Sequence, residues 1–103
     1  MITSEIEDIK NQIIEKYNPK DIYLFGSHAK GLTNKNSDVD ICVVINTDNK
    51  RKLLQEMLYN IDYNNDVDIV IYTEEEWNKY RFDTTTFANI INRTGVSILG
   101  RYN

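Results

Sequence analysis

Three short apolar segments constrain the fold of this chain more than any other feature. They are DIYLF at 21–25, VDICVVI at 39–45 and VDIVIY at 67–72. The second segment is apolar almost throughout after Asp40, which is typical of a β-strand that is covered on both faces. The sequence therefore predicts a β-sheet with a buried central strand.

Helices are predicted around these strands. A first helix over about 5–17 ends before Pro19, because proline has no backbone donor. Its inward face is marked by apolar residues at helical spacing, which are Ile6, Ile9, Ile13 and Tyr17. Asp48 is predicted to cap a second helix, whose inward positions are Leu53, Leu54, Met57, Leu58 and Ile61.

The last third of the chain predicts two further helical segments and a strand. Thr73 and Glu76 have the spacing of a capping box, before a short helical turn that carries Trp77. A last helix is expected from about Thr84 to Arg93, with Gly95 as its C-terminal cap. Its predicted inward residues are Phe87, Ile90 and Ile91. The segment VSIL at 96–99 would then add a fourth strand.

This order of elements predicts the fold class. It is α/β (α+β), with a small mixed β-sheet and helices packed mainly on one face. At 103 residues, 1–103 are expected to form a single domain with one core.

Composition narrows the location and the partners. No apolar run is long enough to span a bilayer, and the acidic N-terminus does not resemble a signal peptide. The single cysteine, Cys42, lies in an apolar run and is expected to be a buried, inert thiol in a reducing compartment. We therefore expect a cytoplasmic protein. A net charge of −4 argues against direct binding of nucleic acid through a broad basic surface.

Paired aspartates at the strand starts indicate a metal site. Asp38 and Asp40 are two residues apart, so their carboxylates point to the same face of a strand. Asp66 and Asp68 repeat the spacing at the next strand, and a helical crossover could set the two pairs side by side. Like charges so close together require a cation, and Mg²⁺ is the expected one.

A glycine-containing loop before these aspartates indicates a phosphate ligand. Gly26 permits close approach of the backbone, and the Ser27 hydroxyl and nearby amides can bind phosphate oxygens. Gly31 allows a second tight turn, and Lys30 offers a positive charge. With two metal ions, such a site could support in-line displacement at a nucleotide phosphorus. Each dipeptide alone is equally typical of a turn or a strand end, so only the joint pattern favours this chemistry.

The joint pattern resembles the signature of the DNA polymerase beta-type nucleotidyltransferase superfamily. An apolar strand runs into Gly26-Ser27, Gly31 follows, and Ser37-Asp38-Val39-Asp40 begins the next strand. The resemblance implies that Asp38, Asp40 and Asp68 are catalytic and bind two Mg²⁺ ions, with Asp68 helping to deprotonate the attacking hydroxyl. It also implies that ATP is the substrate and is bound through Gly26, Ser27, Lys30 and Ser37.

Nearly the whole chain is similar to the minimal nucleotidyltransferases, and FANIINRTGVSIL at 87–99 is similar to their closing helix, glycine and strand. This group includes antitoxins of HEPN/MNT toxin-antitoxin modules. The resemblance implies transfer of AMP from ATP to a tyrosine of a HEPN ribonuclease toxin, in a hetero-oligomer. No added acceptor-binding domain is evident in the sequence, which also favours an acceptor on another protein.

Two alternatives stay open from the sequence. The chain could be a non-catalytic antitoxin that neutralises the toxin by binding, or it could transfer nucleotides to a small molecule or a nucleic acid. The roles of Asp66 and His28 are also open. Surplus aromatic residues could serve core and rim packing, or they could form a face for a partner or for self-association. They are Tyr59, Tyr63, Trp77, Tyr80, Phe82 and Tyr102.

Overall fold

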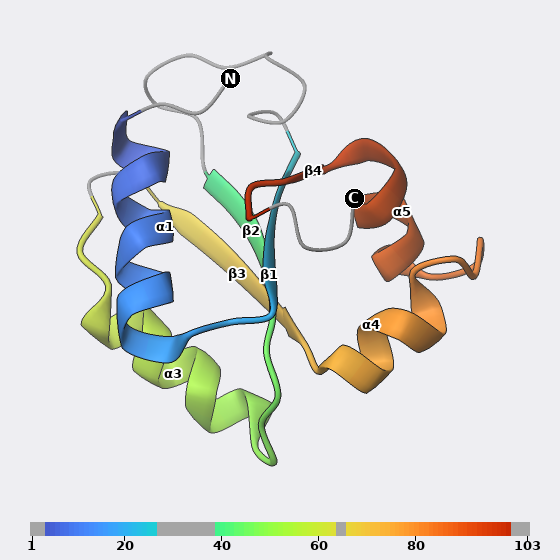
Figure 1. Cartoon of the computed structure of the whole chain (residues 1–103), viewed down its shortest axis with the longest axis horizontal. Coiled ribbons are helices and arrows are strands. Elements are labelled where there is room, and N and C mark those ends of the chain that lie inside the picture. The colour runs from blue at the N-terminus through green and yellow to red at the C-terminus, as the bar shows by residue number, and fades with distance from the viewer. Residues whose placement is uncertain (1–3, 27–38, 64–65, 100–103) are drawn as a thin grey trace.

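The computed structural model describes residues 4–26, 39–63 and 66–99 (Figure 1). The first half contains α1 (Ser4–Tyr17), β1 (Asp21–Phe25) and β2 (Val39–Val44). The second half contains α3 (Lys50–Asn60), β3 (Val67–Tyr72), α4 (Glu74–Tyr80), α5 (Phe87–Thr94) and β4 (Val96–Ser97). No described helix is long and apolar enough to cross a membrane.

The strands form one mixed sheet in the order β3-β2-β1-β4. β1 is antiparallel to both β2 and β4, while β2 and β3 are parallel and joined through α3. The predicted small mixed sheet is confirmed, and the three apolar segments form its first three strands. The fourth strand is shorter than the expected 96–99 and covers only Val96–Ser97.

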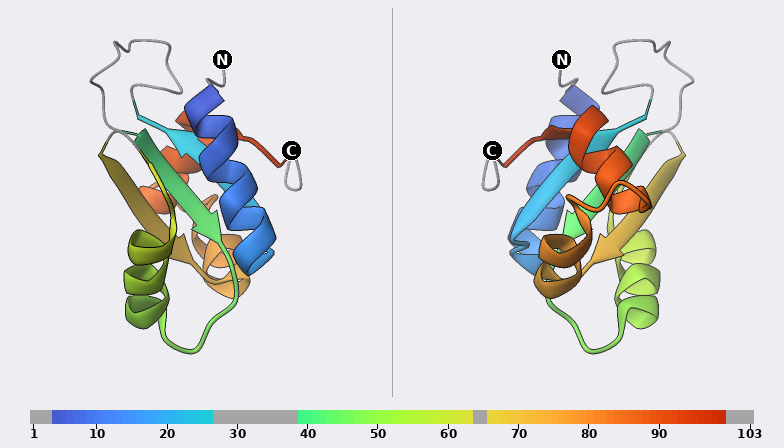
Figure 2. Two further views of the ribbon diagram at one scale, coloured as in Figure 1. Left: turned by 90° about the vertical axis from the view of Figure 1, so that its left-hand side faces the viewer. Right: turned by 90° about the vertical axis from the view of Figure 1, so that its right-hand side faces the viewer.

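Two hydrophobic clusters lie on opposite faces of the sheet. The larger contains Ile22, Ile41 and Ile69 and the inward residues of α1 and α3. The smaller contains Tyr23 and Cys42 together with inward residues of α4 and α5. Neighbouring residues of one strand fall in different clusters because strand side chains alternate. The helices therefore cover both faces (Figure 2), which corrects the expectation that they pack mainly on one face.

The first two helices follow their apolar patterns. The side chains of Ile6, Ile9 and Ile13 are fully buried, as predicted for α1. The N-cap of α3 is Asn49, whose side chain accepts a hydrogen bond from the Lys52 amide, so the prediction of Asp48 was one residue early. In α3 Met57 is fully buried, whereas Leu58 is exposed, because 11 residues of helix present only a narrow stripe to the sheet.

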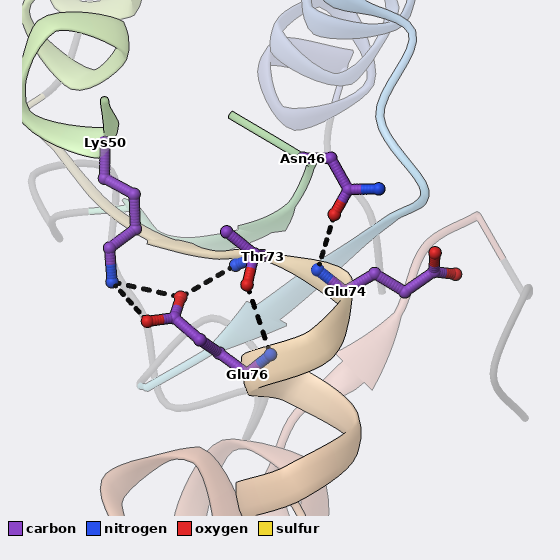
Figure 3. A network of polar contacts seen from close by, with 5 residues as sticks. All are labelled: Asn46, Lys50, Thr73, Glu74 and Glu76. Atoms are coloured by element: carbon purple, nitrogen blue, oxygen red, sulfur yellow. Dashed lines mark hydrogen bonds and ion pairs between the residues drawn. The ribbon is translucent and has the colours of Figure 1, made fainter. Parts of the chain in front are cut away.

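A polar network fixes the start of α4, as Figure 3 shows. Thr73 accepts a hydrogen bond from the Glu76 amide and Glu76 accepts one from the Thr73 amide, which confirms the capping box. Lys50 donates to both oxygens of Glu76 at 3.0 and 2.9 Å, and Asn46 accepts from the Glu74 amide at 2.9 Å. The network ties α4 to the start of α3 and to the segment after β2.

The last helix differs most from its prediction. α5 begins at Phe87 with Thr86 as N-cap, three residues later than expected. Ile91 is buried as predicted, but Phe87 and Ile90 are 49% and 45% exposed. Ala88 and Asn89 face the sheet in their place. The side-chain amide of Asn89 donates a hydrogen bond to the Arg81 carbonyl at 2.8 Å.

The aromatic residues divide between core and surface. Trp77 is fully buried, and its ring lies 4.9 Å from that of Tyr23 and 5.5 Å from that of Tyr72. Tyr59 and Phe82 are largely exposed. Trp77 therefore belongs to the core, whereas Tyr59 and Phe82 do not.

Candidate active site

The two described aspartates of the predicted site are partners in the sheet. Asp40, near the start of β2, is in register with Asp68, near the start of β3. On its other side, Asp40 is in register with Phe25, the last residue of β1. We call these three residues the site row. Because adjacent strands lie about 4.8 Å apart, its members are immediate neighbours across the sheet.

All three residues of the site row lie on the face that carries α4 and α5. Phe25 packs against the smaller cluster, and Asp40 alternates with Val39 and Ile41 of the larger one. Asp68 likewise alternates with residues of the larger cluster. The two carboxylates therefore project from the same face, as the predicted side-by-side arrangement requires.

Solvent reaches the site row unequally. Asp40, on an inner strand, is partly buried, whereas Asp68 is exposed on β3, the edge strand of the described sheet. Asp66 lies just before β3, is exposed, and accepts a backbone hydrogen bond from the Val39 amide at 2.9 Å. The row is thus open at its Asp68 end.

Gly26 lies directly against Asp40. Its φ is +72°, a conformation that side chains strongly disfavour. A Cβ built at this position would overlap the Asp40 carboxylate oxygen Oδ2 and would lie 3.1 Å from the carboxyl carbon. Glycine is therefore required both by the turn after β1 and by the room that the Asp40 carboxylate occupies.

A second glycine, Gly95, lies near Phe25, at the end of the site row opposite to Asp68. A Cβ at Gly95 would lie 2.6 Å from the Ile91 carbonyl oxygen, 2.9 Å from the Leu24 carbonyl oxygen and 3.3 Å from the Phe25 Cβ. Gly95 is the C-cap of α5, as predicted, but its φ of −89° is not left-handed. It is needed for close packing of the helix end against β1.

α5 also contributes a ring next to the site row. The rings of Phe25 and Phe87 lie 5.7 Å apart at an interplanar angle of 82°. The sequence indicated neither this contact nor the role of Gly95 in packing, because both depend on how α5 lies across the end of β1.

Buried Asp21 was also missed, although it accepts hydrogen bonds from Ser97 and the Ile22 amide.

The remaining predicted site residues lie outside the described part of the chain. They are Ser27, Lys30, Ser37 and Asp38, and Gly31 and His28 lie there as well. Of the predicted carboxylates, the structure brings together Asp40 and Asp68.

The chemistry of this pair suits a hard divalent cation. Adjacent carboxylates repel each other unless a positive charge lies between them. Mg²⁺ uses one or two carboxylates, with waters and substrate phosphates completing its oxygen ligands. In the described ranges, which omit Asp38, no group of three or more acidic, His or Cys side chains is placed to hold a metal. The pair is thus a fitting but partial ligand set.

Cys42, two residues beyond Asp40 on β2, has no access to solvent. Burial raises the pKa of its thiol far above the ordinary value, and the charge of Asp21 raises it further. The predicted buried and inert thiol is therefore consistent with the structure, and we assign Cys42 to the core.

A surface hollow of about 420 Å³ lies elsewhere, on the side of the sheet covered by α1. Its lining residues are Ser4, Glu5, Asp8, Asp62 and Tyr63. Three of these five are acidic, so the hollow would repel a triphosphate. The site row is the better candidate for a nucleotide site.

Comparison with known proteins gives one family match. A family model described as a nucleotidyltransferase domain matches residues 6–92, which include the whole site row. No curated protein matches the chain significantly.

Proposed function

The chain belongs to the nucleotidyltransferase domain family, and we propose that it is an Mg²⁺-dependent protein adenylyltransferase. In this proposal it transfers AMP from ATP to a tyrosine of a HEPN ribonuclease toxin in the cytoplasm and so acts as the antitoxin. The observation that carries the catalytic part is the register pairing of Asp40 with Asp68 on one face of the sheet.

The proposed reaction assigns different roles to the two carboxylates. Asp40 and Asp68, with Asp38, would hold the metal, which when bound polarises the phosphate oxygens and offsets the charge of the leaving group. The acceptor oxygen forms a bond to the α-phosphorus, the bond from that phosphorus to the bridging oxygen breaks, and pyrophosphate leaves. The hydroxyl proton passes to Asp68, the more exposed of the two described carboxylates.

The triphosphate is proposed to lie along the turn after β1. The positive φ of Gly26 brings its backbone against the Asp40 carboxylate without a side chain between them, so a phosphate bound along this turn would lie next to the proposed metal ligand. Ser27, Lys30 and Ser37 are proposed to complete this binding site.

The acceptor is proposed to be a protein because the site row opens at an edge. Asp68 is exposed on β3, the edge strand, so a large acceptor can reach the α-phosphorus without entering an enclosed pocket. A tyrosine on a protein surface would satisfy this geometry. The partner, the tyrosine and the antitoxin role derive from the resemblance to minimal nucleotidyltransferases.

The test is transfer of label from ATP to the protein encoded beside this one. The chain, Mg²⁺ and α-labelled ATP should label the wild-type partner, and Asp38→Asn should abolish the label. Substituting the labelled tyrosine of the partner by phenylalanine should also abolish it. Absence of label with the wild-type chain would refute the protein-acceptor proposal, and label on a small molecule or nucleic acid would replace it.

A further inference from the structure

The rings of Phe25 and Phe87 form what we call the aromatic corner. Phe25 belongs to the site row and is the register partner of Asp40. Phe87 comes from α5 and lies nearly at right angles to it, with an interplanar angle of 82° and centroids 5.7 Å apart. In an edge-to-face contact the ring that presents its edge keeps both of its own faces clear of its partner.

Phe87 exposes about half of its surface to solvent, although it begins a helix that packs on the sheet. The residue is 49% exposed although its ring contacts that of Phe25, whereas Ile91, one turn further along α5, is fully buried. An apolar ring surface that contacts Phe25, the register partner of Asp40, has the character of a binding site, where apolar walls accompany a few polar groups. It suits a ligand that is flat and aromatic at one end and anionic at the other.

The order of residues across the sheet indicates which substrate meets this corner. Gly26, where the phosphate chain is proposed to lie, directly follows Phe25 on β1. Asp68, where the acceptor is proposed to enter, lies on β3, beyond Asp40. The aromatic corner is thus at the nucleotide end of the site row and is separated from the acceptor end by one strand.

We infer that the aromatic corner of Phe25 and Phe87 binds the base of the nucleotide whose phosphates lie at the site row. This inference rests on the proposed function, since it needs a nucleoside triphosphate at Asp40 and Asp68. Stacking on an aromatic ring is available to every base, because each has a flat π-face. The corner therefore adds affinity for nucleotides without selecting among them.

The experiment compares two ligands that share a phosphate chain but differ in the nucleoside. α,β-Methylene-ATP and inorganic tripolyphosphate are titrated calorimetrically, with MgCl₂, into the wild type, Phe87→Ala and Ile90→Ala. Loss of a ring under a base weakens binding about tenfold, so Phe87→Ala should lose about this factor for the ATP analogue. Binding of tripolyphosphate should be unchanged. Ile90→Ala, on the same helix and similarly exposed, should change neither affinity.

A further variant separates stacking from folding. Phe87→Trp keeps a ring face and should bind the ATP analogue within a few-fold of the wild type, whereas Phe87→Leu should behave like Phe87→Ala. An equal loss for both ligands in Phe87→Ala would show a general disturbance of the site and overturn the inference. Unchanged binding of the ATP analogue would also overturn the inference, even if the KM for the acceptor rose in a transfer assay.

The same titration distinguishes this inference from the proposed function. If the wild type binds neither ligand, the proposed function fails, and the inference fails with it. If the wild type binds both ligands and Phe87→Ala binds them equally well, the proposed function stands and only the aromatic corner is refuted.

Discussion

The backbone of Gly26 lies against the carboxyl group of Asp40, so closely that a Cβ at position 26 would overlap Oδ2. This contact joins the turn after β1 to the first described carboxylate of the site. It also gives the glycine two separate requirements, a positive φ of 72° and free space beside the carboxylate.

These two requirements can be separated by a double-mutant cycle. Gly26→Ala should lower the free energy of unfolding by about 3 kcal/mol, from the disfavoured φ and the overlap together. In an Asp40→Ala background the overlap is removed, so the same substitution should cost only about 1 kcal/mol. Urea denaturation of the four proteins measures the coupling. Equal costs in both backgrounds would show that the contact with Asp40 carries no energy.

Ligand-dependent stability tests the metal role of Asp40. Mg²⁺ with α,β-methylene-ATP at about ten times its Kd should stabilise the wild type by about 1.4 kcal/mol, or several degrees in Tm. Asp40→Asn should lose this increase. Its Tm without ligand should be no lower than that of the wild type, because the neutral side chain no longer repels Asp68.

The control for this measurement is Glu75→Gln, which changes an exposed carboxylate on α4, outside the site row. It should retain the full increase in Tm. If Asp40→Asn retained it as well, Asp40 would have no part in binding the metal and nucleotide.

Close packing of α5 on β1 predicts a large effect at Gly95. In Gly95→Ala the new methyl group would meet the carbonyl oxygens of Ile91 and Leu24 at 2.6 and 2.9 Å. Backbone atoms cannot turn aside as a flexible side chain can, so we expect a loss of about 2–3 kcal/mol. Thr94→Ala, at the preceding exposed position, should cost less than about 1 kcal/mol. Similar losses for the two variants would contradict the packing argument.

The capping network of α4 predicts a dependence of stability on pH. The hydrogen bond from the Thr73 amide, and then the contact with Lys50, lower the pKa of Glu76 below its ordinary value of 4.5. The native state thus favours the ionised carboxylate. Its contribution is complete above pH 4.5 and is lost as the pH falls through the lower native pKa.

Glu76→Gln should therefore be less stable than the wild type at neutral pH, by about 0.5–1 kcal/mol, because solvent screens this partly exposed pair. The difference should shrink as the pH is lowered from about 6 to about 3. Urea denaturation across this range measures it, with Glu75→Gln as the control that should show no such trend. A difference that stayed constant with pH would mean that the carboxylate charge does not contribute.

Sequence reasoning succeeded where one physical cause dominated. The strand 39–44 was evident because a short segment that is apolar on both faces is typical of a covered inner strand. A helical crossover was expected to set the two aspartate pairs side by side, because such a connection joins parallel strands. The register of Asp40 with Asp68 came from the structure.

It failed where tertiary packing chose among local possibilities. The local sequence allows Phe87 and Ile90 to face inward as readily as Ala88 and Asn89. The length of the preceding turn decides between them, because it fixes the residue at which α5 begins. Asn89 is buried because it donates to the Arg81 carbonyl and accepts from Arg93, which no local pattern indicates.

Transfer from differently labelled ATP tests the central claim most directly, namely that the carboxylate pair of Asp40 and Asp68 supports nucleotidyl transfer. With the neighbouring protein as acceptor, label from the α-phosphate should become covalently attached, and label from the γ-phosphate should be released as pyrophosphate. Asp40→Asn and Asp68→Asn should each abolish attachment while remaining folded. Attachment of the γ-label, or undiminished transfer by folded Asp40→Asn and Asp68→Asn, would contradict the account.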